Sequence, residues 1–107
     1  MNKTLIAARQ QFGDQLRASM DACGVDAARL AERLRGQGYQ GASDKLMSSL
    51  QQGLIRPDTM LMTHLSTLLP ILYREHHGVE AAPDRFAAMR ELGEQLAHTR
   101  GATAVRR

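Results

Sequence analysis

The stretch 43-SDKLMSSLQQG-53 is short, polar and nearly uncharged, although the chain around it is rich in arginine. Leu46, Met47 and Leu50 recur at helical spacing, which predicts one buried face. Ser43 is a favoured N-cap residue and Gly53 a favoured C-terminal stop, so the stretch predicts one short helix. The other face of this helix would carry hydroxyls, amides and one lysine. Such a face is either simply solvated or lies against the hydrogen-bond donors and acceptors of another molecule.

Helical patterns also precede this stretch. The first predicted helix runs from about Thr4 to Cys23 and ends at Gly24, and its apolar stripe consists of Leu5, Phe12, Leu16, Met20 and Cys23. Asp26 is the expected N-cap of a second helix, whose inward residues are Leu30, Ala31 and Leu34. The segment GQGYQG, residues 36–41, contains three glycines and is predicted to be a loop.

Two further helical patterns follow the stretch. Pro57 or Asp58 starts a helix whose inward residues are Leu61, Met62, Leu65, Leu68 and Leu69. Pro70 is expected to kink or restart this helix, which would leave residues 71–77 as a short further turn. Pro83 or Asp84 then opens a last helix, which extends to about His98.

The composition supports the same fold class. A chain of 107 residues suits one domain with a modest core. Aromatic residues make up 4% of the chain and tryptophan is absent, so the core must consist of Leu, Met, Ala and Ile, which favours helix over sheet. Since no segment carries a strand signal, we expect an all-α bundle of five or six helices.

The charge and the cysteine content limit the possible partners and compartments. The chain has a formal net charge of +3 and a sequence pI near 9.6, which is compatible with a polyanionic partner without proving one. A single cysteine excludes an intramolecular disulfide and suits a reducing compartment. No segment resembles a signal peptide or the roughly 20 apolar residues of a membrane span. We therefore expect a cytoplasmic protein with no membrane partner.

The order of the predicted helices resembles that of the lambda-repressor-like helix-turn-helix family, which includes the phage repressors and Cro-like proteins. The first motif helix of that family reads roughly S-x-x-x-L-A-x-x-L, and the matching residues here are Asp26, Leu30, Ala31 and Leu34. The recognition helix commonly reads S-x-x-x-I-S-x-[IL]-E-x-G, and this chain supplies Ser43, Met47, Ser48, Leu50, Gln51 and Gly53. In that family, basic residues, a proline, a capping residue and an apolar helix often follow the glycine. This chain has Arg56, Pro57, Asp58 and the apolar run to Leu69 at those places.

The resemblance covers about Phe12 to Leu69 and implies a helix-turn-helix core within residues 1–78. Residues 79–107 would then form an additional C-terminal helix and tail. The chain departs from the family pattern in two places. The segment RGQGYQGA, residues 35–42, replaces a turn of three or four residues, and Gln51 stands where the family prefers glutamate. Because lengthening a loop costs little chain entropy, the two motif helices can still cross.

The resemblance also implies a DNA-binding surface. In helix-turn-helix proteins the second helix lies in the major groove, where hydroxyls and amides suit the donors and acceptors of base edges. The family pattern places Asp44, Lys45 and Ser49 at base-reading sites, and the full set of predicted base contacts is Ser43, Asp44, Lys45, Ser48, Ser49 and Gln52. The predicted phosphate contacts are Arg29, Arg33, Arg35, Tyr39, Gln40 and Arg56. The alternatives are that Tyr39 anchors the loop on the core and that Arg33 is merely solvated.

Catalytic and metal-binding arrangements have little support in the sequence. His76 and His77 are adjacent, so on a helix they point about 100° apart, which is poor geometry for one metal ion. Cys23 lies on the apolar stripe of the first helix, where packing is the expected role. The glycine-rich segment 36–41 lacks the preceding strand of a phosphate-binding loop. We therefore expect no enzymatic activity, no metal and no cofactor.

The last predicted helix carries an apolar stripe of its own, formed by Phe86, Met89, Leu92 and Leu96. Because helix-turn-helix proteins usually pair on two half-sites, we expect a homodimer joined by this stripe on a palindromic operator. The alternative is that the stripe folds back on its own core, over Leu5 and Ile6. The sequence thus predicts a sequence-specific double-stranded DNA-binding transcriptional regulator, most simply a repressor. The competing hypothesis is a helical protein-interaction module, an adaptor or inhibitor on the same scaffold.

Overall fold

The computed structural model describes residues 3–98 of the chain. Within this range the secondary structure is entirely helical, which confirms the all-α class. The helices are α1 (Lys3–Cys23), α2 (Ala27–Gly36), α3 (Asp44–Gln51), α4 (Thr59–His77) and α5 (Ala87–His98). Of the predicted C-terminal segment, residues 99–107 lie outside the described range.

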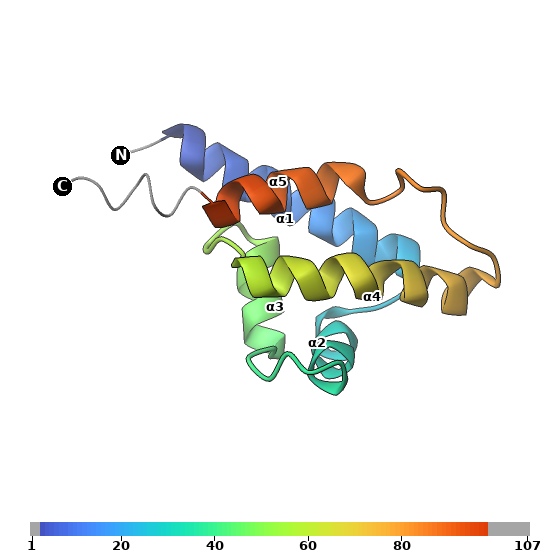
Figure 1. Ribbon diagram of the computed structural model, residues 1–107. Coiled ribbons are helices and arrows are strands. Elements are labelled where there is room, and N and C mark those ends of the chain that lie inside the picture. Colours follow the sequence, from blue (N-terminus) through green and yellow to red (C-terminus); the bar gives the residue numbers. More distant parts are fainter. Residues whose placement is uncertain (1–2, 99–107) are drawn as a thin grey trace.

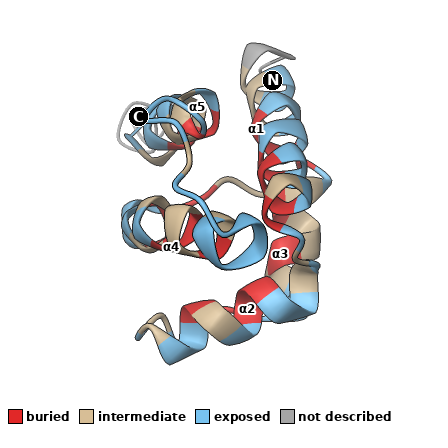
Figure 2. Cartoon of the chain, turned by 90° about the vertical axis from the view of Figure 1, so that its right-hand side faces the viewer, coloured by how far each residue is buried: buried red, intermediate tan, exposed pale blue. Residues whose placement is uncertain are grey.

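Three of the helices form a bundle and two lie across it. Helices α1, α4 and α5 pack against one another, while α2 and α3 lie beside them on one side (Figure 1). Helix α3 contacts both α1 and α2, and α2 also contacts α4. The view turned by 90° shows that the buried positions of the helices face the interior (Figure 2). Helix α3 is thus supported from behind by α1 and from the side by α2.

Local capping interactions set the starts of three helices, as the sequence predicts. The side chain of Asp26 accepts a hydrogen bond from the backbone N–H of Arg29 at 2.8 Å. Ser43 accepts from the N–H of Leu46 at 3.0 Å, and Asp58 accepts from the third residue of its helix at 2.7 Å. Each bond satisfies a donor that the first helical turn leaves without a backbone partner. The predicted starts of α2, α3 and α4 are confirmed to within one or two residues.

A single apolar cluster joins all five helices. Leu and Met dominate this core, as the composition predicts, and its fully buried side chains include Phe12, Leu16, Leu30, Leu34, Met47, Leu50, Leu61, Leu65, Leu69, Met89 and Leu96. A Cβ atom added to Gly93 of α5 would lie 2.8 Å from Cε1 of Phe12 and would also overlap the end of Met62. Helix α5 therefore packs closely on α1 and α4.

The structure corrects two predicted details of the last helices. Helix α4 does not restart at Pro70 but continues to His77. The proline removes only the hydrogen bond to the carbonyl of Ser66, and the leucines on both sides of it are buried. Helix α5 begins at Ala87 rather than at Pro83 or Asp84, because the intervening residues form tight turns such as the bond from the N–H of Ala87 to the carbonyl of Asp84 at 3.1 Å.

The apolar stripe of α5 is used inside the molecule and not on its surface. Phe86, Met89 and Leu96 are at most 5% exposed and belong to the common core, and Leu92 is partly buried against it. Three of the four side chains predicted to join a dimer are therefore covered by the chain itself. This packing matches the alternative prediction, and Leu5 also packs on the core, although Ile6 is 43% exposed.

Candidate nucleic-acid interface

Helix α3 is fixed to the rest of the molecule by two side chains without exposed surface, Met47 and Leu50. They lie on the face that packs against α1 and α2, and Leu46 is half-buried beside them. Full burial of a Leu or Met side chain stabilises a fold by about 1.5–3 kcal/mol. The predicted inward face of this helix is confirmed, and so is its short length.

The opposite face of α3 carries the predicted base contacts. The exposed members are Ser43, Asp44, Lys45 and Gln52, while Ser48 and Ser49 are half-buried. The hydroxyl oxygen of Ser43 accepts the capping bond from the helix, so that residue is partly committed to structure. Within residues 3–98, the other five side chains take no part in a hydrogen bond or an ion pair. Their polar groups are therefore available to a ligand.

Helix α1 approaches the end of α3 so closely that no side chain fits between them. A Cβ atom added to Gly13 would lie 2.7 Å from the carbonyl oxygen of Leu50 and closer still to that of Gln51. One turn later Arg17 donates a hydrogen bond from Nη1 to the Gln51 carbonyl at 3.0 Å, which satisfies an acceptor left open at the helix end. Sequence reasoning missed both residues, and the only signal was a glycine beside the core residue Phe12.

The turn between α2 and α3, residues 37–43, is held in one conformation by its own hydrogen bonds. Gly38 adopts a φ of +113°, and its N–H and that of Tyr39 bond to carbonyls of the last turn of α2 at 3.0 and 2.9 Å. Arg35 reaches across the turn and donates from Nη1 to the carbonyl of Ala42 at 2.9 Å. The turn is longer than that of the resembled family, yet it delivers the chain to the N-cap of α3 in a defined position.

The same turn is also attached to α4. The ring of Tyr39 lies 5.5 Å from that of His64, and the Tyr39 hydroxyl lies 3.4 Å from a carboxylate oxygen of Asp58. Burial and the nearby Asp58 carboxylate raise the pKa of Tyr39, so the phenol keeps its proton. Gln37 donates from its side-chain amide to the carbonyl of His64 at 3.1 Å. Tyr39 thus anchors the turn, which is the alternative that the sequence left open.

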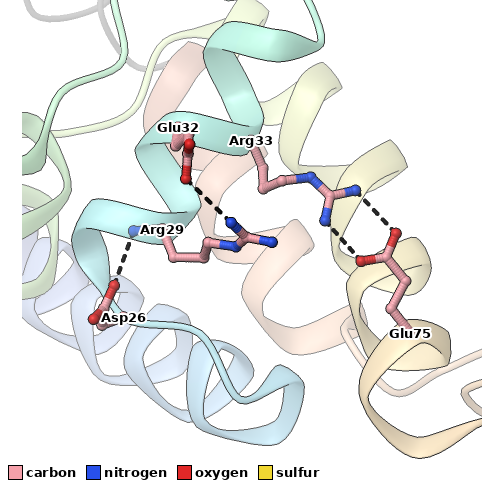
Figure 3. A network of polar contacts seen from close by, with 5 residues as sticks. All are labelled: Asp26, Arg29, Glu32, Arg33 and Glu75. Atoms are coloured by element: carbon pink, nitrogen blue, oxygen red, sulfur yellow. Dashed lines mark hydrogen bonds and ion pairs between the residues drawn. The ribbon is translucent and has the colours of Figure 1, made fainter.

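Two of the three arginines of α2 lie on its side towards α4 and are paired within the chain. Arg33 forms a two-pronged ion pair with Glu75, with N–O distances of 2.7 and 3.0 Å (Figure 3). Arg29 pairs with Glu32 at 3.2 Å. The hydrogen bond from Arg33 lowers the pKa of Glu75 and also raises that of Arg33 itself. Both guanidinium groups have carboxylate partners of their own, so neither is free to bind phosphate without losing one.

The remaining predicted phosphate contacts lie at the two ends of α3. Arg35 and Gln40 are exposed near its start, where Gln40 lies 3.5 Å from the carbonyl of Arg35. Arg56 is half-buried in the connector after α3 and lines a shallow hollow with Met60 and Ala97. The structure therefore separates the six predicted residues into an α2 pair directed at α4, an anchor at Tyr39, and three residues that flank α3.

The groups considered for catalysis occupy packed or isolated positions. Burial raises the pKa of the Cys23 thiol to about 11, and its sulfur lies 3.4 Å from the carbonyl of Leu69, so it is an unreactive packing group. His77 contacts the carbonyl of Ala22 at 2.7 Å rather than sharing a ligand with His76. Among the described residues, no three His, Cys, Asp or Glu side chains gather where they could hold a metal ion.

Two further findings complete the description. No helix within residues 3–98 combines the length and the apolar character needed to cross a membrane. Searches against protein-family models, curated proteins and solved structures found no match to this chain.

Proposed function

We propose that the protein is a sequence-specific double-stranded DNA-binding transcriptional regulator that inserts α3 into the major groove. The observation that carries this proposal is the way α3 packs on the core while it leaves polar side chains without partners. Two fully buried side chains fix the helix from behind, while five polar side chains on its other face have no hydrogen-bond or ion-pair partner within the described residues: Asp44, Lys45 and Gln52, which are exposed, and Ser48 and Ser49, which are half-buried. Helices that read base edges need this combination of a rigid mount and uncommitted donors and acceptors.

The N-terminal half of α3 supplies the proposed base contacts. Lys45 is exposed and can donate to O6 and N7 of guanine, and Asp44 can accept from N4 of cytosine. Ser49 lies one turn later and is half-buried, so it would reach a base only where the helix approaches the floor of the groove closely. Occupying the groove with these residues would exclude other proteins from the site, which is the basis for proposing repression.

The phosphate contacts are proposed near the two ends of α3 rather than at the two α2 arginines that are paired with carboxylates. Arg35 and Gln40 lie before the helix and Arg56 lies after it, so together they can grip the backbone on both sides of the groove. Arg33 is not retained as a phosphate contact, because moving its side chain to DNA would leave the Glu75 carboxylate without its ion-pair partner. We therefore expect a modest dependence of affinity on salt, since few phosphates are neutralised.

Selection of binding sites from a random duplex pool tests the proposal directly. Successive rounds should enrich a short sequence, and the enriched duplex should bind more tightly than random DNA at the same salt concentration. A pool that shows no enrichment would reject sequence-specific binding. Titration with salt gives a second measure, because binding that depends on phosphate contacts weakens linearly on a double-logarithmic plot.

Two copies on a palindromic operator remain part of the proposal, but not through the α5 stripe. One recognition helix makes few base contacts, and pairing on half-sites about one DNA turn apart would double them. Since Phe86, Met89 and Leu96 are buried, any pairing must use another surface or occur only on DNA. Sedimentation with and without the enriched duplex measures this, and one copy per duplex at saturation would reject pairing.

The competing function is a protein-interaction module built on the same scaffold. The intramolecular pairing of Arg29 and Arg33 favours it, because that pairing removes positive charge from the side of α2. Residues 25–57 include five basic and three acidic residues, which is a small positive surplus for a DNA-binding surface. A module of this kind would bind random duplex DNA weakly even at low salt and would show little dependence on salt.

A further inference from the structure

His64 contacts the turn that leads into α3 through two atoms at once. The side-chain nitrogen Nε2 of Gln37 lies 3.1 Å from the backbone carbonyl oxygen of His64 and also 3.1 Å from Nδ1 of the same residue. Both residues are half-buried, and the contact joins the first residue after α2 to the second turn of α4. It is one of the few polar links between the turn and the bundle.

The two acceptors near Gln37 determine which atom of each side chain donates in this contact. A backbone carbonyl oxygen only accepts hydrogen bonds, so the Gln37 atom beside it must be the amide nitrogen and not the amide oxygen. That nitrogen only donates, and therefore Nδ1 of His64 must accept. The bond from Gln37 to the ring can form only while Nδ1 carries no proton.

Protonation of His64 would place two donors against each other. The imidazolium carries a proton on Nδ1, which then faces the N–H groups of Gln37. The other titratable groups on this side are Tyr39, whose ring is 5.5 Å from His64, and Asp58, which bonds to the Tyr39 hydroxyl. Both would attract an imidazolium, yet neither gives Gln37 an acceptor in place of Nδ1. The charged ring can therefore remain near the turn while Gln37 loses its bond to Nδ1 and keeps only the bond to the His64 carbonyl.

We propose that His64 is a positioning residue for α3: its unprotonated Nδ1 is the second of two acceptors that hold Gln37, and with it the turn 37–43, against α4. The turn ends at Ser43, the N-cap of α3, so a shift of the turn moves the end of the helix that carries Lys45. His64 itself stands on α4 and is not among the proposed DNA contacts. Its effect on DNA rests on the proposed function, whereas its effect on the turn does not.

The first experiment follows the turn without DNA. A proton–nitrogen NMR titration from about pH 8 to pH 5 covers the range in which histidines take up a proton. The side-chain amide of Gln37 and the backbone amides of Gly38 and Gly41 should shift together with the ring signals of His64. Turn signals that stay constant while His64 titrates would overturn the inference, whatever DNA does.

A variant that keeps the acceptor but cannot titrate provides the matched control. In His64→Asn the side-chain oxygen stands near the position of Nδ1 and can accept from Gln37 at every pH. The turn signals of this variant should be independent of pH. Gln37→Met supplies a second variant, which removes the donor and should make the turn insensitive to His64 titration even if the asparagine variant folds poorly. pH-dependent turn signals in Gln37→Met would also overturn the inference.

The second experiment measures affinity for the duplex enriched from the random pool. The wild type should lose about fivefold in affinity between pH 8 and pH 5 beyond any loss shown by His64→Asn, as expected for one hydrogen bond. His98→Asn, at the exposed end of α5, should keep the wild-type slope. Equal slopes for the wild type and His64→Asn would overturn the positioning of α3. If no duplex is enriched at any pH but the turn signals follow His64, the proposed DNA function fails and the contact with the turn stands.

Discussion

Helices α2 and α3 are neighbours of similar size, yet their polar side chains are used in opposite ways. Both arginines that α2 directs towards α4 are paired with carboxylates of the chain, Arg29 with Glu32 and Arg33 with Glu75 (Figure 3). Among the described residues of α3, Gln51 donates to Sδ of Met20, whereas Asp44, Lys45, Ser48 and Ser49 have no side-chain partners. The difference indicates that α2 contributes to stability, while α3 presents a surface that an outside molecule can complete.

Gly13→Ala should have the largest effect on stability, because it acts where α1 packs against the end of α3. The new methyl group would overlap the carbonyl oxygens at the end of α3, and backbone atoms there cannot move without displacing the helix. We expect the free energy of unfolding to fall by about 3 kcal/mol, the upper part of the usual range for overpacking. Urea unfolding followed by circular dichroism measures it. An unchanged midpoint would show that α1 and α3 do not meet so closely.

Lys45→Ala tests the different roles of α3 and α2 through the affinity for DNA rather than through stability. Loss of a base contact should weaken binding to the enriched duplex by about 1–3 kcal/mol and leave the urea midpoint unchanged. Arg29→Ala is the matched control, since it removes one exposed positive charge from the neighbouring helix. Filter binding or fluorescence anisotropy on both variants decides the matter, and equal losses for the two would contradict the division between these helices.

Arg56→Ala should weaken binding to enriched and random duplexes alike. A phosphate contact carries no sequence information, so its loss lowers both affinities and reduces the slope of affinity against salt by about one. Arg33→Met should leave that slope unchanged, because Arg33 is engaged by Glu75. Salt titrations of the two variants on random duplex measure both slopes, and a reduced slope for Arg33→Met would return Arg33 to the DNA-binding surface.

Glu75→Gln should expose the contribution of the α2–α4 ion pair to stability. Arg33 lowers the pKa of Glu75 below its ordinary value of 4.5, so the pair stabilises the folded state fully above that pH. As the pH falls through the lowered pKa, Glu75 becomes protonated and the contribution is lost. Melting temperatures of wild type and variant should therefore differ slightly at pH 7 and converge at low pH. Glu91→Gln, an exposed carboxylate of α5, serves as the control.

The parts of the structure that the sequence predicted depend on neighbours within a few residues. Ser43 caps α3 because its hydroxyl reaches an N–H three residues later, and Gly53 ends the same helix because its φ of +75° suits glycine. Contacts between distant residues could not be inferred in this way. Arg33 and Glu75 are 42 residues apart, and no local pattern links them.

The same limit explains the failure of the predicted dimer stripe. Phe86, Met89 and Leu96 recur at helical spacing whether they pack on the chain's own core or on a second copy. Periodicity identifies a face that must be buried, but it does not identify what buries it. The polar face of α3 could be predicted for the opposite reason, because a face that is not buried can be recognised without knowledge of distant partners.

Gly36→Ala should produce the smallest change and test whether α2 serves stability alone. Gly36 is the last residue of α2, and an added Cβ atom would meet nothing within 4 Å. Alanine restricts the unfolded chain and suits a helix better, so we expect a gain of about 0.5–1 kcal/mol in the free energy of unfolding. Gly38→Ala is the matched control, because its φ of +113° strains any L side chain and should make that variant less stable. The two urea midpoints should move in opposite directions, while the affinity of Gly36→Ala for DNA should equal that of the wild type. A change in that affinity would mean that the end of α2 also takes part in binding, and the contrast between the two helices would then fail.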